Sequence, residues 1–210
     1  MGVAGAGAGL PTWWQADSIG RMTRFTLPRP TSGDIIDLII DDHRVMESLL
    51  RDVRDSSGDR EAARQAYSAL LVAHSVAEEE EVYPTLRTKT AQVGEHEVEH
   101  GEEEHAEGLA ALLELLEAKG TDTQKYDDAA EKASNYLYHH VVEEELTILN
   151  PARSDLSDAV RADLGAKFLA RRSALLDEDC GDIETVRRLV ARAVKDDTIP
   201  SADLPESPGH

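Results

Sequence analysis

Apolar residues recur every three or four positions through most of the chain between residues 34 and 195. This spacing is the period of one face of an α-helix, whereas the strict alternation of a β-strand does not persist beyond a few positions. The apolar pattern and the turn-forming residues between its segments predict an all-α fold. We expect four long helices, near 34–55, 59–83, 95–118 and 123–150.

Helix-breaking residues set the expected ends of these helices. The first helix should stop in the cluster Asp55-Ser56-Ser57-Gly58, and the third should stop at Gly120. Pro84 is expected to close the second helix and Asn150-Pro151 the fourth, because proline lacks the N–H group that would continue the hydrogen-bond ladder.

Polar side chains interrupt all four apolar stripes, near the middle of the helix or beyond it. At these places a packed bundle would normally have an aliphatic residue. Burying this much polarity without a ligand would cost several kcal/mol, so we interpret the set as a binding site. The interrupting residues are His43 in the first helix, His74 and Glu78 in the second, His105 in the third, and His140 and Glu144 in the fourth.

The same motif ends the second and the fourth helix. Residues 74–84 and 140–150 share the order His-x3-Glu-Glu-x2-aliphatic-bulky-breaker. An acid-histidine dipeptide lies upstream of each copy, Asp42-His43 in the first half and Glu104-His105 in the second. The chain is therefore interpreted as a duplicated helical hairpin, in which each half directs two histidines and one glutamate inward.

The His-x3-Glu spacing suits metal binding. Residues at positions i and i+4 lie one above the other on a helix, with Cβ atoms about 5–6 Å apart, so both can bind one ion. The glutamate can also bridge to a second ion with its other oxygen. Four histidines and two carboxylates inside a helical bundle are the ligand set of a di-metal site. Mixed imidazole and carboxylate ligands with vacant positions suit redox-active iron, although manganese and zinc accept the same groups.

Other histidines fit the site less well. His139 shares its helix face with polar residues, so His140 is the better ligand. His96 and His100 lie in an acidic run and are expected to be exposed, although they could collect a surface cation. The acidic residues 79–81 are interpreted as a solvated face and as hydrogen-bond partners of the ligands.

Composition limits the classes of partner. Asp and Glu total 42 against 22 Lys and Arg, which gives a net charge of -20. Such a surface repels phosphate backbones and anionic membranes, so we expect no nucleic-acid and no membrane partner. No apolar run approaches the roughly 20 residues that span a bilayer. The single cysteine, Cys180, and the lack of a signal-peptide pattern favour a cytoplasmic location.

Four segments follow from these patterns. Residues 1–33, which include Trp13 and Trp14, are rich in Gly and Pro and predict a flexible leader. Residues 34–151 hold the bundle. Residues 152–195 predict two amphipathic helices that pack on the outside of the bundle or at a subunit contact. Residues 196–210 predict a disordered tail. The oligomeric state does not follow from the sequence.

The pattern His43 … His74-x3-Glu78 … His105 … His140-x3-Glu144 resembles the hemerythrin-like (HHE cation-binding) family over about residues 34–151. The resemblance implies an up-down-up-down four-helix bundle around two iron ions joined by an oxo or hydroxo bridge. It also implies that His43, His74, His105 and His140 bind iron and that Glu78 and Glu144 bridge the two ions.

One position departs from the family pattern. Oxygen-carrying members have a second histidine on the third helix, one turn before His105, where this chain has Gly101. Plain oxygen transport is therefore disfavoured. Tyr83 is the nearest additional ligand, and the alternative is a tyrosine that only packs before Pro84.

Three functions fit the sequence. The first is a non-haem di-iron protein that handles or senses dioxygen, peroxide or nitric oxide. The second is a catalase-like enzyme that decomposes peroxide, which the reduced histidine count favours because oxygen ligands stabilise oxidised iron. The third is an iron-buffering protein or a helical interaction module.

Overall fold

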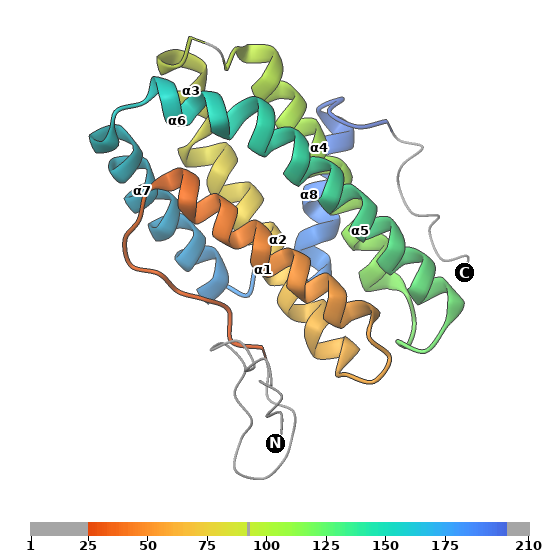
Figure 1. The fold of residues 1–210 in the computed structure, drawn as a ribbon. Helices are drawn as coiled ribbons and strands as arrows, with labels where there is room; N and C mark the ends of the chain where they lie inside the picture. Colours follow the sequence, from red (N-terminus) through yellow and green to blue (C-terminus); the bar gives the residue numbers. More distant parts are fainter. Residues whose placement is uncertain (1–24, 92, 201–210) are drawn as a thin grey trace, which may run out of the picture.

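The computed structural model describes residues 25–91 and 93–200. Within them the fold is all-α, as predicted, and four long helices form an up-down-up-down bundle (Figure 1). These helices are α1 (Ile35–Arg54), α2 (Arg60–Glu81), α4 (Glu95–Glu117) and α5 (Gln124–Glu144). Trp13, Trp14, most of the predicted leader and residues 201–210 of the predicted tail lie outside the described residues.

Local sequence explains where three of these helices begin. Asp34 accepts a hydrogen bond from the backbone N–H of Ile36 at the start of α1, over 3.0 Å. Asp59 and Thr123 play the same part at the starts of α2 and α5. Each side chain satisfies a backbone donor that the helix itself leaves free, which stabilises the helix end by about 1 kcal/mol.

The structure corrects two predicted helix ends. The helix α2 stops at Glu81, and the chain continues through Val82 into the short helix α3 (Tyr83–Lys89). After α5, a π-helical turn η1 (Glu145–Leu149) leads into α6 (Asn150–Asp155). Pro84 and Pro151 lie in the first turns of α3 and α6. Proline fits there because the first N–H groups of a helix have no intrahelical acceptor, so it begins a helix instead of ending one.

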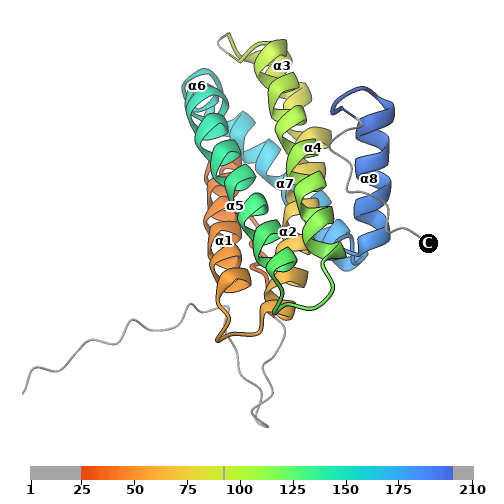
Figure 2. The same ribbon diagram turned by 90° about the vertical axis from the view of Figure 1, so that its right-hand side faces the viewer.

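Two C-terminal helices pack on the outside of the bundle. The helix α7 (Asp158–Asp177) lies against α1 and α2, and α8 (Ile183–Lys195) lies along α4 (Figure 2). Residues 25–33 run beside α7, where the Arg29 guanidinium donates to Asp177 over 2.8 Å. No helix in the described ranges is long and apolar enough to cross a membrane.

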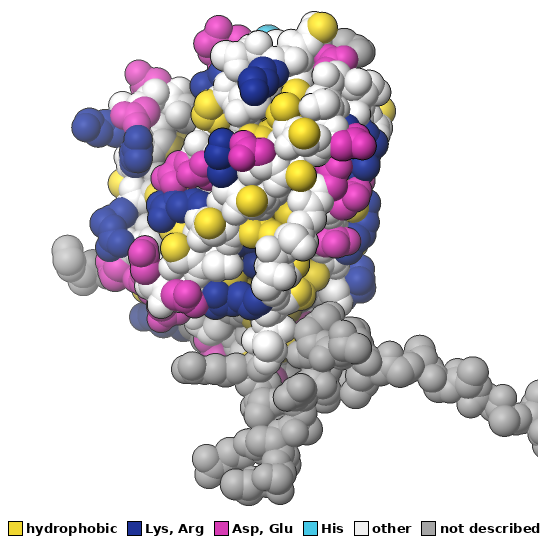
Figure 3. Space-filling model, turned by 90° about the vertical axis from the view of Figure 1, so that its left-hand side faces the viewer, with side chains coloured by type: hydrophobic (Ala, Val, Ile, Leu, Met, Phe, Trp, Pro, Cys, Tyr) yellow, Lys and Arg dark blue, Asp and Glu magenta, His cyan; other side chains and the backbone are white. Residues whose placement is uncertain are grey.

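Surface ion pairs join the C-terminal helices to the bundle. Figure 3 shows acidic and basic side chains lying beside one another on the side of the molecule where α7 lies. Arg153 donates to Asp37 of α1 over 2.6 Å. Arg161 of α7 donates to Asp34, the residue that caps α1, also over 2.6 Å. These partly exposed pairs orient the helices more than they stabilise them.

The two ends of the bundle differ in polarity. Around the α1–α2 and α4–α5 turns the interior is mostly apolar, with Val53, Ala63, Leu115 and Tyr126 fully buried. The buried guanidinium groups there, of Arg60 and Arg64, donate to backbone carbonyls. The half toward α3 and α6 instead buries histidines and carboxylates. Apolar side chains such as Val82, Leu86 and Ile148 are buried in this half as well, so both halves contribute hydrophobic stabilisation of about 25 cal/mol per Å² of apolar area buried.

A buried ion pair links α7 to α1. Arg172 is fully buried and donates two hydrogen bonds to the Asp42 carboxylate, over 2.7 and 2.8 Å. Its remaining nitrogen donates to the carbonyl of Pro28 over 3.0 Å. This paired geometry suits a guanidinium and a carboxylate, and it satisfies both charges away from water.

Replacing Arg172 with methionine should destabilise the protein by about 3–5 kcal/mol, because Asp42 would lose the cation that balances its buried charge. The matched control is Arg171→Met, since the neighbouring Arg171 pairs with Glu80 at the surface. Its cost should stay below about 1 kcal/mol. Urea unfolding of both variants measures the difference, and equal losses would contradict the importance of the buried pair.

Candidate metal centre

The structure brings the six predicted ligand residues to one buried place in the polar half of the bundle. Each of the six side chains belongs to a residue no more than 5 % exposed. Ring centres of neighbouring imidazoles lie 4.7 Å apart for His105 and His140 and 5.1 Å apart for His43 and His74. The residues come from all four bundle helices: His43 from α1, His74 and Glu78 from α2, His105 from α4, and His140 and Glu144 from α5.

Two overlapping groups have the spacing of metal ligands. In each group the ligand atoms lie within 4.8 Å of one another. Ligands at about 2.0–2.2 Å from one ion lie at most about 4.4 Å apart, so small shifts complete either group. One group is His43, His74, His140 and Glu144, and the other is His74, Glu78 and His105.

The inward-facing atoms of this cluster have no hydrogen-bond partner among the described residues. They are the Nε2 atoms of all four histidines, both carboxylate oxygens of Glu78 and Oε2 of Glu144. A single buried polar atom without a partner costs about 1–3 kcal/mol, so concentrating them in one place is unfavourable unless something binds there. All of these atoms are lone-pair donors, so cations fit the site.

The opposite nitrogen of each imidazole faces a carboxylate. An imidazole that donates its Nδ1–H outward presents the lone pair of Nε2 inward, which is the form that binds a metal ion. The outer carboxylates therefore orient the histidines for this task. The Nδ1–oxygen distances are 3.1 Å for His43 and Glu145, 3.5 Å for His74 and Asp42, 3.0 Å for His105 and Glu79, and 3.2 Å for His140 and Glu104.

The four outer carboxylates form a closed ring around the bundle. Each carboxylate lies on an element adjacent to the helix of the histidine that it faces. Asp42 of α1 faces His74 of α2, Glu79 of α2 faces His105 of α4, Glu104 of α4 faces His140 of α5, and Glu145, the first residue of η1, faces His43 of α1. The internal duplication is thus complete, since Asp42 matches Glu104 and Glu79 matches Glu145. The sequence motif contains all four residues, but it does not reveal which histidine each one serves.

Two arginines hold members of this ring, and the sequence analysis missed both. Arg172 binds Asp42, and Arg44 donates to both oxygens of Glu145 over 2.9 and 2.8 Å. Burial alone would raise the pKa of Asp42, but its interactions with His74 and Arg172 lower it below the usual value. The hydrogen bond with His43 and the charge of Arg44 lower the pKa of Glu145 despite partial burial. Both carboxylates are thus ionised acceptors at neutral pH.

The inner groups are tuned by burial and by each other. Burial lowers the pKa of His140 to about 4, which keeps the ring neutral and its lone pair available. Burial and the charge of Glu144 raise the pKa of Glu78 well above its usual value. Glu144 behaves in the opposite way, because its interactions with His43 and His140 outweigh burial and lower its pKa. The neighbouring carboxylates of Glu78 and Glu144 are both buried away from water, so they do not both ionise without a cation between them.

Tyr83 lies in the space that Gly101 leaves open. Its ring stacks on His105, with ring centres 5.8 Å apart, and its hydroxyl donates to Oε1 of Glu144 over 3.2 Å. A Cβ atom at Gly101 would lie 2.7 Å from that hydroxyl oxygen, which is too close. Burial and the neighbouring carboxylates raise the pKa of Tyr83 well above its usual value, so the phenol keeps its proton. Any side chain at position 101 would compete with Tyr83 for the same space.

The other histidines of the described residues and the cysteine do not belong to the six buried ligand residues. His96 and His100 are exposed, and the side chain of His139 is 60 % exposed, which agrees with the prediction from their helix faces. Cys180 is buried, and burial together with nearby acidic residues raises the pKa of its thiol to about 11. It is therefore a poor nucleophile.

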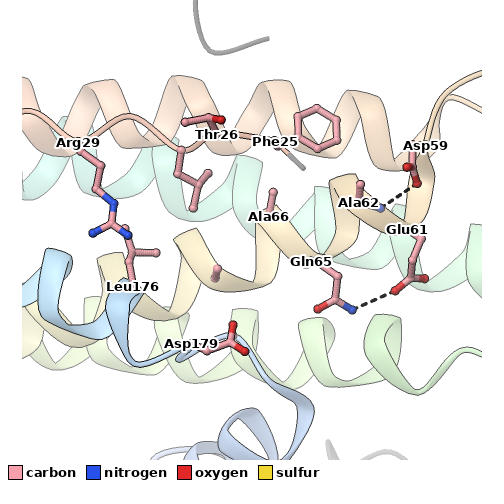
Figure 4. Close-up of a pocket in the computed structure, with 13 residues that line it drawn as sticks. Phe25, Thr26, Arg29, Asp59, Glu61, Ala62, Gln65, Ala66, Leu176 and Asp179 are labelled. Atoms are coloured by element: carbon pink, nitrogen blue, oxygen red, sulfur yellow. Dashed lines mark hydrogen bonds between the residues drawn. The ribbon is translucent and has the colours of Figure 1, made fainter. Parts of the chain in front are cut away.

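A separate groove of about 990 Å³ lies between residues 25–29, the start of α2 and the end of α7 (Figure 4). Two of its three carboxylates accept hydrogen bonds within the start of α2. Asp59 accepts from the N–H of Ala62 over 3.0 Å, and Glu61 accepts from Gln65 over 3.0 Å. None of the six predicted ligands lines it. The groove offers no group that points to chemistry.

Comparison with known proteins agrees with this geometry. The description "Hemerythrin HHE cation binding domain" matches residues 34–151. The chain is also similar to a protein named DNA nickase from Nostoc sp. (strain PCC 7120), with 26% identity over 145 residues. That match covers 68% of this chain and 40% of the relative, so the chain spans about two fifths of the length of that protein. No solved structure matches the chain.

Gly101→Ala should force Tyr83 aside, and overpacking of this kind costs about 1–3 kcal/mol, partly offset by the helix preference of alanine. Tyr83→Phe deletes the hydroxyl and relieves the worst of the clash, leaving a contact of 3.2 Å between the new Cβ and Cζ of the ring. Gly101→Ala should therefore be at least about 1 kcal/mol less destabilising in the Tyr83→Phe background. Chemical denaturation of both single variants and the double variant tests this, and strictly additive effects would show that the two positions do not compete.

Proposed function

This chain belongs to the family of hemerythrin HHE cation-binding domains, and we propose that it binds two iron ions and uses them to sense or handle dioxygen, peroxide or nitric oxide. One observation carries the proposal. Four imidazole Nε2 atoms, both oxygens of Glu78 and Oε2 of Glu144 face one another without hydrogen-bond partners among the described residues, while a carboxylate oxygen lies 3.0–3.5 Å from Nδ1 of every imidazole. This arrangement costs stability in the absence of cations and is favourable in their presence.

The distances support a division of the ligands between the ions. Oε2 of Glu144 lies 3.1 Å from Nε2 of His43 and 3.5 Å from Nε2 of His140. In the other half, Oε2 of Glu78 lies 3.3 Å from Nε2 of His74 and 3.7 Å from Nε2 of His105. We propose that Glu144 would hold one ion together with His43 and His140, and that Glu78 would hold the other together with His74 and His105.

Iron is the cation that this ligand set favours among those the site could accept. Two imidazoles and shared carboxylates leave coordination positions open, and bound iron would supply ligand binding and electron exchange at those positions. The protein encloses the proposed ions and shields them from larger molecules. Because the six side chains are almost completely buried, only a small molecule could reach them, which suits a diatomic ligand or peroxide.

Nucleic acid is not a partner under this proposal. The name DNA nickase belongs to a relative of which this chain spans about two fifths. The net charge of -20 opposes the approach of a phosphate backbone. We also propose a cytoplasmic setting, in which the single buried cysteine stays reduced.

A second function, catalase-like decomposition of peroxide, is favoured by Tyr83. Its hydroxyl lies at hydrogen-bond distance from Glu144 inside the cluster, in the space beside Gly101. The buried Tyr83 phenol keeps its proton and could donate it to the oxygen that leaves one peroxide as water. It would recover a proton from the second peroxide, which gives up two protons and two electrons as it becomes dioxygen. Two peroxide molecules would give two waters and one dioxygen. The same tyrosine is also the candidate for an additional iron ligand.

Glu78→Met should stabilise the metal-free protein by about 1–3 kcal/mol, because it removes two buried oxygens that have no partner. The same change should lower the iron content below the two ions per chain that we propose for the wild type. The matched control Glu80→Met alters an exposed residue and should change neither property. Urea unfolding and iron analysis measure the two effects, and full iron content in Glu78→Met would rule out Glu78 as a ligand.

Iron-loaded protein should release dioxygen from added peroxide if the second function holds. Tyr83→Phe should then lower the rate about 100-fold, since general acid catalysis contributes about 100-fold to 10,000-fold. Tyr138→Phe is the control, because Tyr138 is 46% exposed and lies outside the cluster. An oxygen electrode follows the reaction. If the iron-loaded wild type releases no dioxygen, the catalase-like function is excluded and ligand sensing is the function that is left.

The absence of stoichiometric iron after purification from iron-replete cells would contradict both functions. The remaining interpretation would then be iron buffering or a helical interaction module.

A further inference from the structure

A second cluster of metal-binding side chains lies at the surface of α4 and α5, outside the buried centre. Its middle is one oxygen of Glu104. Oε1 of this residue lies 3.8 Å from Nε2 of His100 and 3.4 Å from Nε2 of His139. The ligand atoms of the three residues lie within 4.8 Å of one another.

Glu104 is the unusual member of the cluster. It is only 6 % exposed, and its Oε2 accepts the hydrogen bond from Nδ1 of His140. Its Oε1 is buried and has no hydrogen-bond partner in the part of the chain that the structure describes. His140 thus fixes the carboxylate so that its free oxygen points toward the two surface histidines. A carboxylate oxygen held in this way is costly unless a cation or a donor reaches it.

The spacing suits one metal ion. Ligand atoms bound at about 2.0–2.2 Å in tetrahedral geometry lie about 3.3–3.6 Å apart, so the observed 3.4 and 3.8 Å need only small adjustments. His100 and Glu104 lie one turn apart on α4, and His139 comes from the neighbouring α5. The histidine side chains are 47 and 60 % exposed, so they can rotate toward an ion and leave its other positions to water.

His100 also has a carboxylate on the side away from Glu104, at a longer distance than in the buried centre. Its Nδ1 lies 3.8 Å from a carboxylate oxygen of Glu103, which leaves Nε2 directed toward Glu104. A carboxylate behind one ring nitrogen favours metal binding through the other.

We propose that His100, Glu104 and His139 form a further metal site that takes a single divalent ion of the zinc or copper class. Two imidazoles and one carboxylate with an open position are a common ligand set for such ions. The ion would share the Glu104 carboxylate with His140. One side chain therefore joins the surface site to a proposed ligand of the buried centre.

The test uses the full-length protein after its buried centre has been loaded with iron and analysed for metal. Zinc titration by calorimetry should show one additional ion per chain. His100→Gln and His139→Gln should each weaken that binding at least tenfold, and the double variant should lose it. His96→Gln is the matched control, since His96 is an exposed histidine of α4 outside the cluster, and it should bind zinc as the wild type does.

Copper(II) provides an independent readout. Its electron paramagnetic resonance spectrum should show coupling to two imidazole nitrogens in the wild type and lose that coupling in the double variant. Circular dichroism and iron content should stay unchanged in all these variants, because only exposed side chains are altered. Equal zinc binding by wild type and double variant, or no additional ion in the wild type, would overturn the proposal. Failure of the buried centre to bind iron would appear separately in the metal analysis.

Discussion

The structure depends on one repeated contact, in which Nδ1 of a buried histidine faces a carboxylate on the adjacent helix. Four such contacts turn every Nε2 atom toward the same interior point. Without them the rings could rotate, and their lone pairs would not converge. Because each contact crosses from one helix to the next, the four together also fix the relative positions of the bundle helices around the centre.

The C-terminal extension takes part in this arrangement. Its helix α7 supplies Arg172, which binds Asp42, and Asp42 in turn faces His74. Phe168 of the same helix lies edge-on to His74, with ring centres 6.0 Å apart. Arg172 therefore balances the charge of Asp42, and Phe168 helps to exclude water from this side of the centre. The extension therefore supports the proposed site as well as enclosing it.

Gly101 and Tyr83 occupy one space in the bundle that only one side chain can fill. Because a Cβ at position 101 would collide with the phenol, the chain has either a side chain there or the tyrosine hydroxyl beside Glu144. The second arrangement replaces a possible nitrogen ligand with an oxygen that carries a proton. This exchange is the basis of the proposed peroxide chemistry, which needs a proton, whereas simple reversible binding of dioxygen does not.

The helices and the six buried polar residues could be predicted from the amino-acid order, because helical period and i, i+4 spacing are local properties that one stretch of chain displays. The prediction for Pro84 and Pro151 was wrong, since proline suits the first turn of a new helix as well as it ends an old one. The contact of Arg172 with Asp42, 130 residues away, and the position of Tyr83 beside Gly101 became visible only once the helices were packed together. Such pairs depend on how separate helices pack, and packing leaves no periodic trace in either partner's own sequence.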